Sequence, residues 1–100
     1  MEIVKNINGE VAELAINGRL DTNTCVELED ALKEELDNLK EITLDLTNLE
    51  YISSAGLRVL LAIQKKMNSV EDGSLKVKNV SETVMGVFEL TGFTDILTIL

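Results

Sequence analysis

Two neighbouring serines, Ser53 and Ser54, are the residues of this chain best suited to chemistry. They lie in the segment Tyr-Ile-Ser-Ser-Ala-Gly-Leu-Arg, residues 51–58, where a loop leads into a predicted helix. A hydroxyl at the start of a helix lies beside backbone N–H groups that lack intrahelical partners, so a phosphoryl group would be stabilised there. Arg58, one turn later, could add a charge-assisted contact. The pattern indicates a phosphoserine, although a plain N-cap on a tight turn gives the same pattern.

Four further residues are candidates for contact with a partner at this site. Asp21 and Thr22 follow the end of a predicted strand, and Asn48 lies in the loop before the serines. In open α/β sheets, binding sites gather where strands end, so Asp21 is expected beside the serines. Gly56 permits close backbone approach at the turn. Each has an equally simple structural interpretation, as a helix cap, a loop residue or a spacer.

The composition excludes several kinds of site. The chain has no histidine, so it has neither a Ser-His-Asp triad nor His-ligated zinc. Its net charge of −9 argues against nucleic acid and anionic membranes as partners. No phosphate-binding loop, dinucleotide fingerprint or metal-ligand cluster is found, so we expect no cofactor, no metal and no enzymatic activity. Asp45 is interpreted as a solvated carboxylate, and Cys25 as a small buried hydrophobe.

The location is expected to be the cytoplasm. A single cysteine, Cys25, suits a reducing compartment. No leader-like segment opens the chain, and no apolar run approaches the roughly 20 residues needed to span a bilayer.

The elements that must position the serines form an α/β domain covering residues 1–100. Alternating strands predict a sheet with one wet face, helices mainly on the other face, and strands added in one direction from the hairpin. The tail 93–100 is either a strand or a helical turn. The first expected elements are strands 2–7 and 11–17 around Asn8-Gly9, and then a helix capped by Asp21 or Thr22, with Cys25, Leu28, Leu32, Leu36 and Leu39 on its apolar face. A strand 41–46, a polar loop 47–53 and a helix 55–69 follow. The last elements are a strand around Leu75 and Val77 and a helix from Ser81 to Gly92, with Val84, Val87, Phe88 and Leu90 on its apolar face.

Several of these segments together resemble the STAS family, and within it the anti-sigma factor antagonists. The residues that carry the resemblance are 51–58, Asp45-Leu46 before them, Gly-Arg-Leu-Asp-Thr at 18–22 and Leu-Thr-Gly-Phe at 90–93. The resemblance implies a mixed sheet opened by a hairpin and phosphorylation of Ser54, two residues before the glycine. Ser53, where the best-known members commonly have aspartate, is the alternative acceptor.

The same resemblance implies the partners. The unphosphorylated form would bind an anti-sigma factor that is itself a serine kinase, and so free the sigma factor. Phosphorylation would block this binding, and a metal-dependent serine phosphatase would restore it. We expect a monomer or weak dimer.

Two other functions are possible for a small acidic α/β protein. A phospho-aspartate receiver needs an acidic cluster after its first strand, whereas that strand here ends at Asn8-Gly9. The other alternative keeps the fold and changes the partner, as a STAS module that is the partner-binding subunit of a transport or stress-signalling complex.

Overall fold

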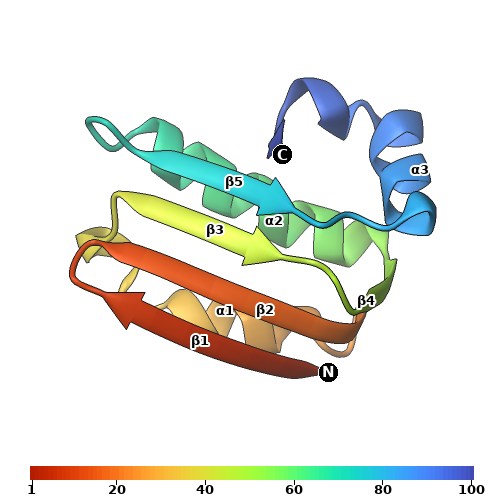
Figure 1. Cartoon of the computed structure of the whole chain (residues 1–100), viewed down its shortest axis with the longest axis horizontal. Helices are drawn as coiled ribbons and strands as arrows, with labels where there is room; N and C mark the ends of the chain where they lie inside the picture. Colours follow the sequence, from red (N-terminus) through yellow and green to blue (C-terminus); the bar gives the residue numbers. More distant parts are fainter.

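A mixed six-stranded sheet, with two of its helices behind it, forms the protein in a computed structural model that describes all 100 residues (Figure 1). The elements are β1 (Glu2–Asn8), β2 (Val11–Leu20), α1 (Cys25–Leu32), the 3-10 turn η1 (Leu36–Asn38), β3 (Glu41–Asp45), β4 (Leu49–Ile52), α2 (Ser54–Asn68), β5 (Ser74–Lys78), α3 (Glu82–Thr91), the 3-10 turn η2 (Phe93–Asp95) and β6 (Thr98–Ile99).

The sheet grows in one direction from the N-terminal hairpin, as predicted. Its order is β1-β2-β3-β5-β6, with β1 antiparallel to β2 and every later pair parallel. The hairpin lies where it was predicted, but Asn8 is the last residue of β1 and pairs with Val11, so the two turn residues are Gly9, with a φ of 64°, and Glu10. The long strand β2 has two partners on one side. Its first half pairs with β3 and its last three residues pair with β4, with a shift of register between Gly18 and Arg19.

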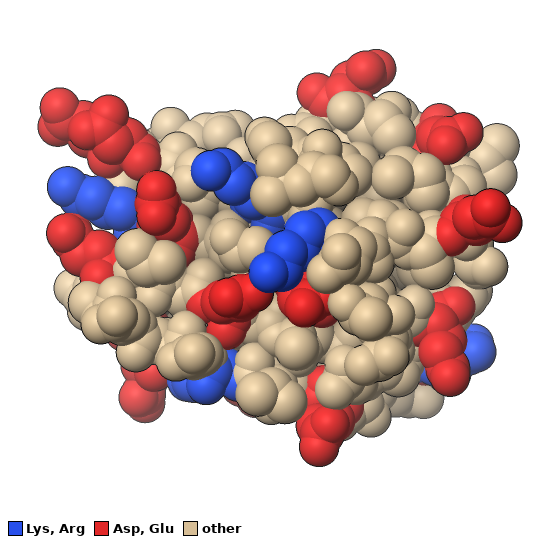
Figure 2. Space-filling view, viewed as in Figure 1, with Lys and Arg blue, Asp and Glu red and all other residues tan.

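The two faces of the sheet differ as the alternation predicts. Side chains such as Leu14, Leu44 and Val77 are fully buried under α1 and α2 and belong to one cluster of 23 buried apolar residues. The opposite face, turned toward the viewer in Figures 1 and 2, is open and carries charges of both signs. On it, Lys78 of β5 forms an ion pair with Glu13 of β2 across the intervening strand β3. The helices α1 and α2 therefore cover one face, whereas α3 lies beyond the ends of the strands (Figure 1).

Both ends of α3 follow the prediction. Ser81 caps the helix, since its Oγ accepts a hydrogen bond from the Val84 N–H at 3.2 Å. Gly92 ends it in the left-handed conformation, with a φ of 80°. The tail contains both of the structures between which the sequence left a choice, because η2 is followed by the short strand β6.

Three predictions about the elements were wrong. The polar loop 47–53 contains β4, because Leu49 and Ile52 are buried against the second half of β2. The first helix ends at Leu32. Leu36 belongs to the 3-10 turn η1, and Leu39 to the short segment between this turn and β3. Leu90 lies outside the apolar face of α3, with 90% of its surface exposed.

Candidate functional site

The two serines at the start of α2 have different roles. Ser53 is the N-cap, in an extended conformation, and its Oγ accepts a hydrogen bond from the Gly56 N–H at 3.3 Å. Ser54 is the first residue of the helix and is exposed. The first N–H groups of a helix have no intrahelical acceptor, and the helix dipole is positive there. The Ser54 hydroxyl is therefore open to solvent at an end of α2 that favours negative charge.

Gly56 holds this end of α2 against the sheet. A Cβ atom on Gly56 would lie 2.8 Å from the carbonyl oxygen of Leu20 and 2.9 Å from side-chain carbons of Leu20 and Ile52. Gly56 itself is buried. The first turn of α2 can approach the ends of β2 and β4 only because residue 56 has no side chain.

The end of β2 brings Asp21 next to the serines. Leu20 pairs with Ile52, and the Leu20 carbonyl accepts a hydrogen bond from the Ser53 N–H at 2.9 Å. Asp21 is thus adjacent in the chain to a residue bonded to Ser53. Thr22, which follows it, is exposed.

The Asp21 carboxylate organises the turn that leads into α1. Its Oδ1 accepts hydrogen bonds from the N–H groups of Asn23 at 3.0 Å and Thr24 at 3.1 Å. The Thr24 Oγ1 accepts in return from the Asp21 N–H at 2.9 Å. The hydrogen bond from the Thr24 N–H is the main cause that holds the pKa of Asp21 below its usual value. The prediction that Asp21 or Thr22 caps the first helix was wrong, because α1 begins at Cys25 and its N-cap is Thr24, while Asp21 stabilises the turn before it.

Sequence reasoning missed an exposed pair beside this turn. The Arg19 guanidinium lies over the Tyr51 ring, 4.4 Å from its centroid, and the Arg19 Nε is 4.0 Å from the Asp21 Oδ2. Arg19 and Tyr51 are partners in the β2–β4 register. A cation over an aromatic ring is a stable arrangement, and both residue types are frequent at the centres of protein interfaces. No local pattern predicted this pair, because it depends on the β2–β4 register that places Tyr51 opposite Arg19.

Asn48 lies apart from the serines. Its carbonyl accepts a hydrogen bond from the Gly18 N–H at 2.9 Å, at the beginning of β4, whereas Ser53 follows the end of that strand. The four residues of β4 extend about 13 Å at roughly 3.3 Å per residue. A partner that contacts both Asn48 and Ser54 would have to cover the length of β4.

Asp45 is more constrained than the solvated carboxylate that its position predicted, and that interpretation was wrong. Its Oδ1 accepts hydrogen bonds from the Thr47 hydroxyl at 2.6 Å and the Thr47 N–H at 3.0 Å. The side-chain amide of Asn79, in the left-handed region with a φ of 58°, donates a third at 3.1 Å. These bonds hold the pKa of Asp45 below its usual value, and the bond from the Thr47 hydroxyl has the largest effect. Asp45 therefore joins the loops that follow β3 and β5.

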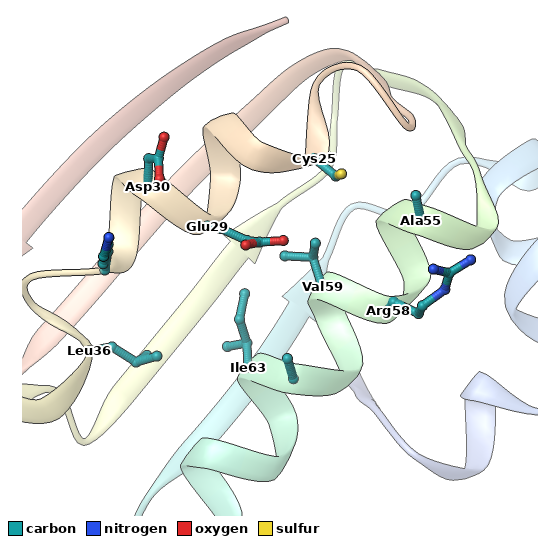
Figure 3. Close-up of a pocket in the computed structure, with 10 residues that line it drawn as sticks. Cys25, Glu29, Asp30, Leu36, Ala55, Arg58, Val59 and Ile63 are labelled. Carbon is teal, nitrogen blue, oxygen red and sulfur yellow. The ribbon is translucent and has the colours of Figure 1, made fainter.

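An open groove of about 590 Å³ runs between α1 and α2 (Figure 3). Cys25 points across it toward Ala55, so this thiol is half-buried at a groove and not in the core as predicted. Arg58 lies at its edge, with its guanidinium turned away from α1. Arg58 is exposed and forms no ion pair, and it lies one turn after Ser54 on α2. It is therefore available to an anion at the start of α2.

The fold is that of a small α/β protein, with the two serines between the end of β4 and the beginning of α2. The sequence profile described as "Mlab, STAS domain" matches residues 3–99. The anti-sigma-B factor antagonist of Staphylococcus aureus is 33% identical over 86 residues, which is 85% of this chain and 79% of that protein. This chain therefore belongs to the STAS domain family, among the anti-sigma factor antagonists.

Solved structures agree on the fold. The unphosphorylated form of the anti-sigma factor antagonist SpoIIAA superposes with a TM-score of 0.85 at 18% identity, over 99% of this chain and 88% of that one. The phosphorylated form of SpoIIAA, a Bacillus cell fate determinant, gives a TM-score of 0.77 at 17% identity, over 99% and 91%. At such identities the likeness shows the fold alone. None of the helices of this protein is long and apolar enough to cross a membrane.

Proposed function

We propose that this protein is a cytoplasmic switch that acts by binding and not by catalysis, and that phosphorylation of Ser54 sets its state. The unphosphorylated form binds an anti-sigma factor serine kinase and frees the sigma factor. Phosphorylation by that kinase blocks binding, and a serine phosphatase reverses it. The observation that carries the proposal is the exposed hydroxyl of Ser54 at the start of α2, beside a Ser53 that is already engaged as the N-cap.

The surroundings of Ser54 suit a phosphoryl acceptor. The added group carries about −1.5 to −2 charges at neutral pH. It would meet the free N–H groups of the first turn, and Arg58 four residues later is exposed and without an ion-pair partner. Ser53 is the weaker acceptor, because its Oγ is half-buried and accepts from Gly56.

The partner-binding surface in this proposal is centred on the first turn of α2. Around it are Asp21 and Thr22 after β2, Ser53 and Arg58 on either side of Ser54, and Asn48 at the far end of β4. Gly56 contributes by setting the position of α2. The Arg19–Tyr51 pair extends the surface along the ends of β2 and β4.

The charge explains why such a switch would be effective. An unpaired dianion buried between two proteins costs several kcal/mol. Since 1.4 kcal/mol is a factor of ten in affinity, about 4 kcal/mol would weaken a complex roughly a thousandfold. That is enough to turn a micromolar complex into a negligible one.

The test is phosphorylation by a candidate anti-sigma kinase and ATP, with the site mapped by mass spectrometry. We expect a stable phosphoserine at Ser54 in the wild type and in Ser53→Ala, and none in Ser54→Ala. Binding of each variant to the kinase is then measured by calorimetry. Ser54→Ala should bind as tightly as the unphosphorylated wild type, and Ser54→Asp at least a hundredfold more weakly.

We expect both Ser54 variants to fold, so a loss of binding would not result from unfolding. Ser54 is exposed, and an aspartate at the first position of a helix is favoured by the helix dipole. Equal affinities of Ser54→Ala and Ser54→Asp would count against the switch. A base-labile acyl phosphate in place of phosphoserine would indicate an aspartate acceptor and overturn the proposal.

A further inference from the structure

The outward side of α3 carries an apolar residue that nothing in the chain covers. Leu90 exposes 90% of its surface, more than any other large hydrophobic residue of the protein. At helical spacing, Gly86 and Val87 lie on the same side of α3 as Leu90, whereas the buried residues Val84 and Phe88 lie on the side that faces the core. Gly86 and Val87 are half-buried, and Val87 also packs against the core cluster. We call Gly86 and Leu90, with Val87, Glu82 and Glu89 at their edge, the Leu90 face.

Gly86 has no function within the chain that would require glycine. It lies inside α3, where glycine is less favourable than alanine, and its backbone is not left-handed. A Cβ atom built on it meets nothing within 4 Å, in contrast to the crowded Gly56. Because residue 86 has no side chain, the space beside the protruding Leu90 side chain is open, and we call this open position the depression at Gly86. That shape suits close packing by a segment from outside the chain.

The charged side chains in the last part of the chain are all acidic. All nine lysines and arginines precede residue 79, whereas residues 79–100 contain Glu82, Glu89 and Asp95 and no basic residue. All three carboxylates are exposed. In the part of Figure 2 that lies over α3, acidic atoms are visible and basic atoms are not. A second copy would bring like charges together, whereas a basic segment would find them complementary.

We propose that the Leu90 face binds a basic amphipathic helix of another protein. The apolar stripe of that helix covers Leu90 and packs into the depression at Gly86. Its lysines and arginines lie against Glu82 and Glu89, which are seven residues apart and hence on one side of α3. The face lies on α3 and includes no residue of the first turn of α2, so its occupation does not require the phosphorylation site.

The test uses the full chain, without any kinase, as bait for a phage-displayed library of 18-residue helical peptides. The library carries leucine at an i, i+3, i+4, i+7 stripe and equal mixtures of Lys, Glu and Gln elsewhere. We expect selected peptides to be enriched in lysine. Leu90→Gln and Glu82→Gln/Glu89→Gln should each weaken the best peptide at least tenfold. Amide chemical-shift changes should be confined to α3 and its neighbours.

Two controls complete the design. Gly86→Gln fills the depression with a good helix former, so it should weaken binding at least tenfold without lowering the melting temperature. Leu100→Gln removes another exposed leucine, outside α3, and should leave binding unchanged.

Three outcomes would overturn the proposal. One is that no peptide depends on Leu90. Another is that acidic or neutral peptides are enriched as strongly as basic ones. The last is a dimer of the free chain in sedimentation equilibrium that Leu90→Gln dissolves, because the occupant would then be a second copy.

Discussion

Gly56→Ala is expected to destabilise the protein, although alanine in place of glycine normally strengthens a helix. The new Cβ would lie 2.8 Å from the Leu20 carbonyl oxygen and 2.9 Å from carbons of Leu20 and Ile52. Non-bonded carbon atoms pack at about 3.5–4.0 Å, so the first turn of α2 or the end of β2 has to move. Overpacking costs about 1–3 kcal/mol, and we expect the upper part of that range because one neighbour is backbone. The higher helix propensity of alanine compared with glycine offsets about 0.5–1 kcal/mol of this cost. The net loss is about 1–2 kcal/mol.

The matched control is the same substitution at Gly86, where a Cβ meets nothing within 4 Å. Here only helix propensity acts, and Gly86→Ala should stabilise the protein by about 0.5–1 kcal/mol. Urea denaturation measures both differences in the free energy of unfolding. In a domain of this size 1 kcal/mol corresponds to about 4–8 °C, so the two melting temperatures should move in opposite directions from that of the wild type.

A Gly56→Ala variant that is as stable as Gly86→Ala would refute the reasoning. It would show that α2 can move away from the Leu20 carbonyl at no cost, so that close approach does not fix the position of Ser54. A destabilised Gly56→Ala variant with an unchanged unfolding m-value would support it, because the m-value reports the surface exposed on unfolding.

Further predictions concern a cap, a carboxylate and a buried amide. Ser53→Ala should cost about 0.5–2 kcal/mol in urea denaturation because it removes the N-cap of α2, whereas Ser54→Ala should change stability by less than about 0.5 kcal/mol. The folded-state pKa of Asp45 is lowered, so this carboxylate contributes stability above about pH 4 that is lost as the pH falls through the folded value. The stability gap between wild type and Asp45→Asn should therefore shrink between pH 6 and pH 3, roughly, and a constant gap would contradict the assignment. The Gln64 Oε1 is buried without a hydrogen-bond partner, so Gln64→Met should raise the stability by about 1 kcal/mol in thermal denaturation, and a lower melting temperature would show that its bond to Asn68 matters more.

The sequence predicts best those elements whose pattern is local. The hairpin follows from Asn8-Gly9 and the alternation around it, and α2 follows from a long run of apolar residues at helical spacing. β4 could not be found in this way. It has only four residues, two of them buried, and it exists because the second half of β2 extends beyond β3 and offers a free edge.

The error at Leu90 has a geometric reason. It is two residues after the buried Phe88, and thus about 200° further around the helix, so its apolar side chain points away from the core. Local periodicity counts an apolar residue as core unless its angular position is checked against the others.

The candidate site was predictable in position and not in detail. That serines lie between the end of a strand and a helix follows from the pattern of residues 46–58. Which serine is the cap depends on the residue at which helical dihedral angles begin, and either serine could have had that role. The cross-strand pair of Arg19 and Tyr51 requires the β2–β4 register, including its shift between Gly18 and Arg19, and no local pattern encodes that.

The geometry around Ser54 also bears on how a switch at this position would act. A dianion on Ser54 would lie at the end of α2 where N–H groups are free, with Arg58 one turn away and unpaired, so its charge could be met without moving the backbone. The Asp21 carboxylate is already held by the N–H groups of the turn before α1 and has no need to rearrange. Gly56 allows the first turn of α2 to pack closely against Leu20. The proposed switch therefore acts at the interface itself, through charge and shape presented to the partner, and not through a change of fold.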